Sequence, residues 1–124
     1  MEKTVRDTID NALWLYAGDE YMGDPMCSIT KGSSQIQICR RLDIDIAVLG
    51  NHEFDYGVER AAAFRDSISI PVLGGANLVF KANGNPFAIT HYDTTVASVP
   101  MRIIGLVPPG LRKRKLITHR NCYE

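Results

Sequence analysis

The sequence predicts an α/β fold with a largely parallel β-α-β-α-β core and an edge hairpin. Two observations carry this prediction. In the first two-thirds of the chain, three short apolar segments alternate with two segments of helical character, an order that favours a parallel sheet with right-handed crossovers. Further along, turn residues and loosely alternating segments replace this pattern, which is typical of a hairpin.

The first half of the core begins with the apolar segment Leu13–Ala17, which predicts a strand that ends at Gly18-Asp19. The run Ser34-Gln35-Ile36-Gln37 matches a capping box, so we expect a helix to begin at or next to its first residue. Ile44–Leu49 is apolar and rich in β-branched residues. This composition is typical of a strand that is buried on both faces.

The second half continues with a predicted helix at Val58–Asp66 and a third parallel strand at Ile70–Ala76. Pro71 stands near the start of this strand, where the lack of a backbone N–H donor for pairing with the next strand matters least. Residues 87–96 alternate loosely, and Met101–Val107 is strongly apolar. We expect these two segments to pair as a hairpin around Ser98-Val99-Pro100.

Length and composition indicate one modest domain with an ordinary core. The chain has 124 residues, 45% of them hydrophobic. Its formal net charge is zero, so the overall electrostatic field does not favour binding to nucleic acid. Neither a membrane-spanning run nor an apolar leader is recognisable, and a cytoplasmic location without membrane contact is the expectation for the chain as it stands. Cys27, Cys39 and Cys122 are interpreted as free thiols.

The C-terminal segment contains a run of four basic residues. Arg112–Lys115 is interpreted as a solvated tail, with a patch for an anionic surface or nucleic acid as the alternative. We therefore divide the chain into a domain at residues 1–110 and a basic C-terminal tail at residues 111–124.

Ligand-type side chains follow two strands that we expect to be neighbours. Asp19 follows the first strand, and Asn51, His52 and Asp55 follow the second. Because carboxyl ends of parallel strands meet at one sheet edge, these side chains are expected to converge there. Asp19 and Asn51 offer oxygen ligands for divalent ions, and His52 can carry a proton near neutral pH. Asp55 could accept the other imidazole N–H and orient the ring.

Each of these residues also has a structural interpretation. Asp19 could be a turn residue, Asn51 could adopt a left-handed conformation, and Asp55 could cap the following helix. Glu53 is expected to be structural, bonding the backbone of its own turn. Capping does not explain well why the whole set stands in one turn.

The motifs Gly18-Asp19 and Gly50-Asn51-His52-Glu53-Phe54-Asp55-Tyr56-Gly57 resemble those of the 5′-nucleotidase branch of the calcineurin-like metallophosphoesterases. The resemblance runs from about Leu13 to Val107 and includes the strand end Pro71–Asn77. It implies that the chain forms the middle of a metallophosphoesterase α/β sandwich, so that residues 1–110 are a partial catalytic domain.

The resemblance also implies site residues, cofactors and a substrate. Asp19 would bridge two divalent metal ions, such as zinc or manganese, and Asn51 would bind the second. His52 would stabilise or protonate at the phosphate, oriented by Asp55. The implied activity is hydrolysis of a small phosphate ester such as a nucleotide, and the implied family is one of phosphoric ester hydrolases active in nucleotide catabolism.

The family's Asp-x-His, Gly-His and Gly-His-x-His motifs do not occur in this sequence. His91 and His119 follow threonines, without the motif. We therefore expect this chain to hold at most one cation weakly and to show little turnover. The alternative is a non-catalytic remnant or binding module that retains half of the fold.

Overall fold

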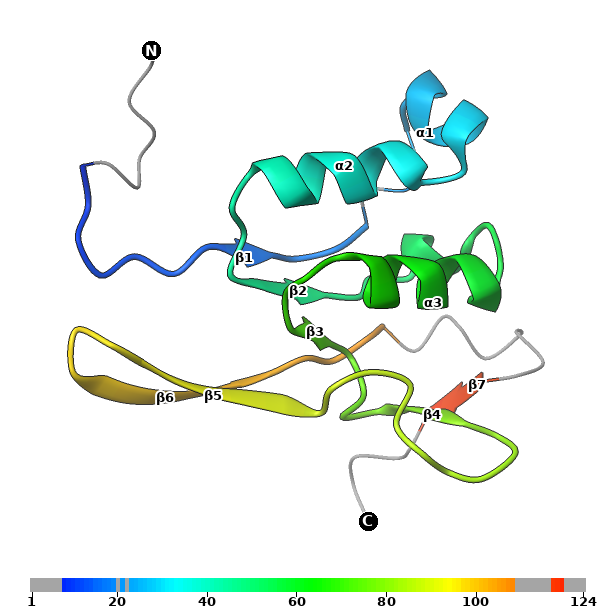
Figure 1. Ribbon diagram of the computed structural model, residues 1–124. Coiled ribbons are helices and arrows are strands. Elements are labelled where there is room, and N and C mark those ends of the chain that lie inside the picture. Colours follow the sequence, from blue (N-terminus) through cyan, green and yellow to red (C-terminus); the bar gives the residue numbers. More distant parts are fainter. Residues whose placement is uncertain (1–7, 20, 22, 109–116, 120–124) are drawn as a thin grey trace.

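The computed structural model describes residues 8–19, 21, 23–108 and 117–119. Its centre is a three-stranded parallel sheet in the order β1-β2-β3, formed by Leu15–Tyr16, Ile46–Val48 and Val72–Leu73 (Figure 1). The register pairs Tyr16 with Ala47, and Ala47 in turn with Val72. The predicted parallel core is therefore confirmed, with β2 as its central strand, although each strand is shorter than its apolar segment.

Helices provide the connections of this sheet. α1 is Pro25–Thr30, α2 is Ser33–Arg41 and α3 is Val58–Ser67. α1 and α2 lead from β1 to β2, and α3 leads from β2 to β3. Figure 1 shows α2 and α3 together on one side of the sheet, as two right-handed crossovers between successive neighbouring strands require.

Two details of the first connection differ from expectation. α1 was not predicted: Asp24 caps it by accepting the N–H of Met26 at 2.6 Å, and Pro25 stands at its first position, where its missing N–H costs nothing. α2 begins at Ser33, as predicted, but its N-cap is Gly32, with φ of 81°, and no side chain caps it. The capping box is therefore wrong, because a left-handed glycine joins the two helices.

The second half of the chain adds two separate antiparallel pairs. β5 (His91–Val96) and β6 (Val99–Ile104) form the predicted hairpin, whose turn is Ala97-Ser98 with φ of 49° and 65°. A parallel bridge between Leu73 and Ile89 ties the start of the hairpin to β3.

The other pair involves residues that the sequence assigned to the tail. β7 (Ile117–His119) pairs with β4 (Leu78–Phe80), and neither strand was predicted. The basic residues 112–115 lie outside the described residues, so the division at residue 110 stays a prediction.

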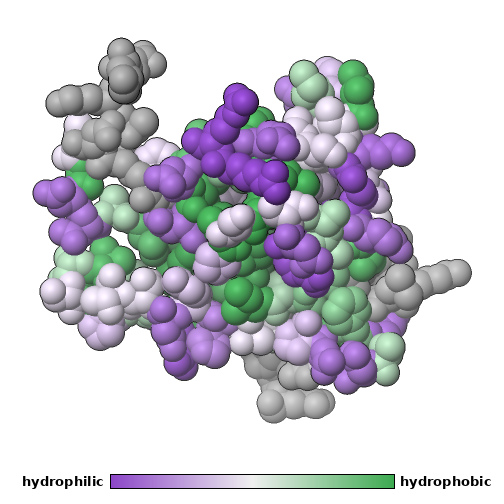
Figure 2. Space-filling view, viewed as in Figure 1, coloured by the Kyte–Doolittle hydropathy of each residue, from purple (hydrophilic) through white to green (hydrophobic). Residues whose placement is uncertain are grey.

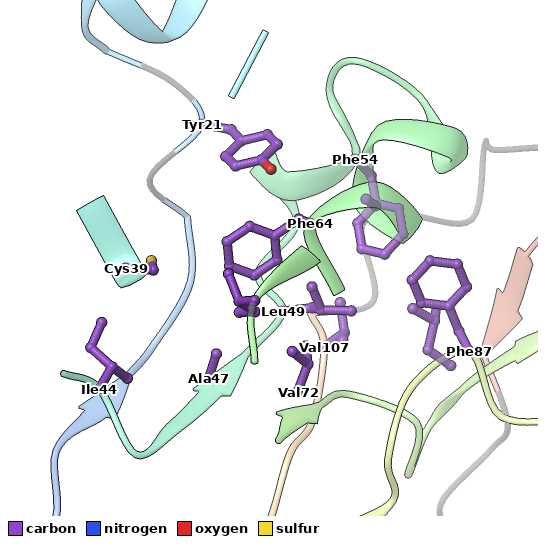
Figure 3. Close-up of a cluster of buried hydrophobic side chains, with 13 residues drawn as sticks. Tyr21, Cys39, Ile44, Ala47, Leu49, Phe54, Phe64, Val72, Phe87 and Val107 are labelled. Carbon is purple, nitrogen blue, oxygen red and sulfur yellow. The ribbon is translucent and has the colours of Figure 1, made fainter. Parts of the chain in front are cut away.

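Aromatic and aliphatic side chains from several elements form the hydrophobic core (Figure 3). Phe64 of α3 packs edge-on against Tyr21 at 5.7 Å between ring centroids, and Phe54 lies 5.3 Å from Phe87. Cys27 and Cys39 are buried and form no disulfide within the described residues, as expected, whereas Cys122 lies outside those residues. The remaining labelled members of the core in Figure 3 are Ile44, Ala47, Leu49, Val72 and Val107.

The face shown in Figure 2 has hydrophilic and hydrophobic side chains interspersed. Among the described residues, no helix combines the length and the apolar character that crossing a bilayer requires.

Candidate active site

Two glycines bring the ends of β1 and β2 into contact. A Cβ atom on Gly18, whose φ is 82°, would lie 2.4 Å from the amide nitrogen of Gly50. A Cβ atom on Gly50 would lie 2.1 Å from Oδ1 of Asp19. Both distances are far below any real Cβ contact, so only glycine allows the two turns to approach this closely.

Asp19 reaches from the first turn into the second. Its backbone is left-handed, with φ of 70°, a conformation that Asp tolerates better than most residues. Its Oδ1 accepts the backbone N–H of His52 at 3.0 Å. The carboxylate therefore lies against the segment Gly50–His52, at the sheet edge where the sequence predicted convergence.

Asn51 stands between the two residues that Asp19 contacts. Its φ and ψ are −78° and −29°, in the right-handed helical region, and its carbonyl accepts the N–H of Phe54 at 3.2 Å. A left-handed conformation therefore does not explain the asparagine. Together with His52, it opens a short 3-10 helix, η2 (His52–Phe54).

His52 and Asp55 form a side-chain pair. Nδ1 of His52 lies 2.6 Å from Oδ2 of Asp55, and the two side chains are 40% and 24% exposed. The hydrogen bond with Asp55 raises the pKa of the ring above its ordinary 6.5, and the negative charges of Asp55 and Asp19 act in the same direction. The N-cap of α3 is Gly57, so the alternative that Asp55 caps this helix is wrong.

Glu53 is completely buried beneath these residues. Its Oε2 accepts the backbone N–H of Gly50 at 2.7 Å and that of Asp19 at 3.0 Å, and its Oε1 accepts the hydroxyl of Tyr16 at 3.3 Å. The expected hydrogen bond between Glu53 and the backbone of its own turn is therefore present, with Gly50 as the donor. The bonds to Asp19 and Tyr16 of the other strand were missed, because sequence spacing carries no signal for a contact across 34 positions.

Carboxylate and amide oxygens are the donor types that hard divalent cations prefer, and here Asp19 is exposed and Asn51 is partly exposed. However, nowhere in the part of the chain that the structure describes do three His, Cys, Asp or Glu side chains gather as a ligand set. The described His, Cys, Asp and Glu side chains therefore do not by themselves complete a two-metal centre.

Comparisons with known proteins show that the chain is similar to 5′-nucleotidases. No family model matches the chain. The 5′-nucleotidase of Rattus norvegicus is 42% identical over 108 residues, covering 83% of this chain and 18% of the relative. The 5′-nucleotidase of Diplobatis ommata is 36% identical over 99 residues, covering 78% of this chain and 17% of the relative.

Two solved structures of nucleotidases are also similar to this chain. A 5′-nucleotidase precursor from Thermus thermophilus superposes with a TM-score of 0.78 and 26% identity, over 92% of this chain and 24% of that one. The NAD nucleotidase of Haemophilus influenzae gives a TM-score of 0.80 and 26% identity, over 95% of this chain and 22% of that one.

The fold is that of the calcineurin-like phosphoesterases, and calcineurin-like phosphoesterase YfkN of Bacillus subtilis shares it with a TM-score of 0.70. Within this class, the chain is similar to part of the 5′-nucleotidases, in line with the resemblance that the sequence showed. The chain spans less than a fifth of the curated relatives named here.

Proposed function

We propose that this chain supplies part of the active site of a metal-dependent phosphoesterase that hydrolyses small phosphate esters, nucleotides foremost. The observation that carries the proposal is the contact between Asp19 and the amide of His52, whose ring is held by Asp55. An acidic oxygen, an amide oxygen and an oriented imidazole, brought to one sheet edge by two turns, are the groups that bind a cation and a phosphate. The relatives named 5′-nucleotidases support the substrate class.

In this proposal, Asp19 and Asn51 hold a divalent cation, which when bound polarises a phosphate oxygen and acidifies a coordinated water. His52 acts on the phosphate. Since Nδ1 is engaged by Asp55, Nε2 is the ring atom left to donate a hydrogen bond or a proton. The raised pKa of His52 favours the protonated ring that this role requires.

We further propose that this chain holds only one cation by itself, and only weakly. Asp19 and Asn51 are too few to fix two ions, since each ion is otherwise satisfied by water. Little turnover is therefore expected from this chain. The second candidate is a binding module without activity, which the lack of a three-ligand cluster among the described residues favours.

Paramagnetic broadening tests the cation site. Mn²⁺ added to the ¹⁵N-labelled chain should broaden the amide signals of Asn51 and His52 first, and Asp19→Asn should abolish this selectivity. Asp10→Asn, at an exposed aspartate before β1, is the matched control and should behave like the wild-type chain. Broadening that ignores Asp19→Asn would contradict the proposed ligand.

Phosphate release separates the two candidate functions. The substrates are nucleoside monophosphates and an aryl phosphate, with manganese or zinc supplied. Slow turnover that His52→Ala removes would support a residual phosphoesterase site. Selective Mn²⁺ binding with no turnover above the His52→Ala background would support the binding module. Robust wild-type turnover would overturn the expectation that this chain is impaired.

A further inference from the structure

We infer that Glu53 is a positioning residue, which fixes the Asp19 carboxylate where a cation and the His52 amide can share it. This inference deepens the proposed function and rests on Asp19 being a cation ligand. Glu53 itself is completely buried, so it is not a ligand in this arrangement. Glu53 can therefore affect cation binding only through the groups that donate hydrogen bonds to it, which are the backbone amides of Asp19 and Gly50 and the Tyr16 hydroxyl.

The argument begins with what a buried carboxylate needs. Burying an ionised carboxylate is costly unless hydrogen bonds satisfy it, and charge-assisted bonds to backbone N–H groups are among the strongest available. Oε2 of Glu53 receives two such bonds, from Gly50 and Asp19, and Oε1 receives the Tyr16 hydroxyl. A single side chain thus joins the end of β1 to the end of β2.

The second step concerns the backbone of Asp19. A non-glycine residue at a φ of 70° is in a sparsely populated conformation, which persists only when its surroundings enforce it. Glu53 is the described partner of the Asp19 N–H and so holds the residue in this conformation. Gly18, immediately before, is also left-handed, with φ of 82°.

The third step is that Glu53 and Asp19 each bind the backbone of the turn that contains the other residue. Glu53 comes from the second turn and holds the backbone of Asp19, while Asp19 comes from the first and holds the backbone of His52 through Oδ1 at 3.0 Å. Each acid therefore uses its side chain to fix the other's turn. If the first bond is lost, Asp19 is free to leave the left-handed conformation, and its carboxylate moves away from Asn51 and His52.

The first test needs no metal. In ¹⁵N spectra, the His52 amide proton reports its bond to Asp19, and the amide protons of Asp19 and Gly50 report their bonds to Glu53. Glu53→Ala should shift all three signals upfield and speed the hydrogen exchange of the His52 amide by about tenfold, the loss expected for a bond worth about 1.4 kcal/mol. An unchanged His52 amide in the folded Glu53→Ala chain would overturn the inference.

The isosteric variant keeps the test decisive if Glu53→Ala does not fold. Glutamine keeps one oxygen for the two amides and can donate its NH₂ to the Tyr16 hydroxyl. Glu53→Gln should therefore retain the His52 signal near its wild-type position, with faster exchange than the wild-type chain. Glu59→Gln, at an exposed position in α3, is the matched control and should change nothing. A Glu53→Gln chain with wild-type exchange at both Asp19 and His52 would contradict the inference.

Mn²⁺ affinity is the second readout. Residues that hydrogen-bond to a metal ligand and orient it typically contribute about 10–100-fold to metal affinity. Glu53→Ala should therefore weaken Mn²⁺ binding, followed by the broadening of the Asn51 and His52 amide signals, by at least about tenfold. Arg60→Met removes the hydrogen bonds from Arg60 to the carbonyl oxygens of Thr30 and Lys31, so it should lower the stability of the fold. It should leave the Mn²⁺ affinity unchanged, which separates an effect on the site from a general loss of stability. If the wild-type chain binds no Mn²⁺, the proposed function fails, whereas the metal-free signals still decide whether Glu53 positions Asp19.

Discussion

Gly18 and Gly50 stand back to back at the ends of neighbouring parallel strands, and neither leaves room for a side chain. The Cβ position of Gly18 is 2.4 Å from the Gly50 nitrogen, and that of Gly50 is 2.1 Å from the Asp19 carboxylate. This contact sets the separation between the two turns that make up the candidate site.

Alanine at Gly18 should therefore be costly for two reasons. The new Cβ meets backbone atoms, which typically costs about 1–3 kcal/mol, and the φ of 82° adds about 1–2 kcal/mol of left-handed strain. Gly23→Ala is a matched control, because Gly23 has φ of 95° but no atom within 4 Å of its Cβ position. Urea unfolding should show a clearly larger loss for Gly18→Ala. Equal losses would mean that the close approach carries no energetic weight.

Removing the charge of Asp55 should lower the pKa of the His52 ring towards its ordinary 6.5. The hydrogen bond that raises this pKa stabilises the folded state fully below pH 6.5, and the contribution is lost as the pH rises through the higher folded value. Following the His52 ring protons by NMR through pH 5–9 in wild-type and Asp55→Asn chains measures the difference. Coincident titration curves would refute the pairing of the two side chains in solution.

Tyr21 should make the fold sensitive to alkali. Its burial, and to a lesser extent the charge of Glu53, raises the pKa of the phenol above its ordinary 10.0. The unfolded chain therefore loses this proton first, and stability falls as the pH rises above about 10. In thermal unfolding at pH 9–11, Tyr21→Phe should lose part of this alkaline decline, whereas Tyr92→Phe, at an exposed tyrosine of β5, should retain it. A decline that is the same in all three chains would assign it to other groups.

Arg60 should stabilise the junction of the first two helices. Its guanidinium donates to the carbonyl oxygens of Thr30 and Lys31, each at 3.1 Å, where α1 ends. Arg60→Met keeps most of the apolar stem but removes both hydrogen bonds, one exposed and one part-buried, at a cost of about 0.5–1.5 kcal/mol. Arg41→Met, at an exposed position of α2, should cost less than about 0.5 kcal/mol by urea unfolding. Similar costs for both would show that the junction does not depend on Arg60.

The elements that the sequence predicted are those with a local signal. The apolar run of β2 and the turn residues beside it were sufficient for the parallel core and for the pairing of His52 with Asp55, which are only three positions apart. β4 and β7 were missed because two short strands that pair across about 40 positions have no periodic pattern of their own. α1 was missed because the Asp-Pro sequence at its start also suits a turn.

Glu53 illustrates the same limit within the site. Its bond to Gly50 spans three positions and was anticipated in kind, whereas its bond to Asp19 depends on which strands are neighbours and in what register. That information follows from the packing of the helices against the sheet. A contact of this type becomes visible only when the tertiary structure is known.

The sequence separation of these bonds has a consequence for the order of folding. The bonds from Glu53 to Asp19 and from Asp19 to His52 close chain segments of 34 and 33 residues, so their entropic cost is met only after β1 and β2 have paired. Local elements such as α2 and the β5–β6 hairpin can form before that on the microsecond timescale. The residues of the candidate site therefore come together late in folding, after distant parts of the chain have met.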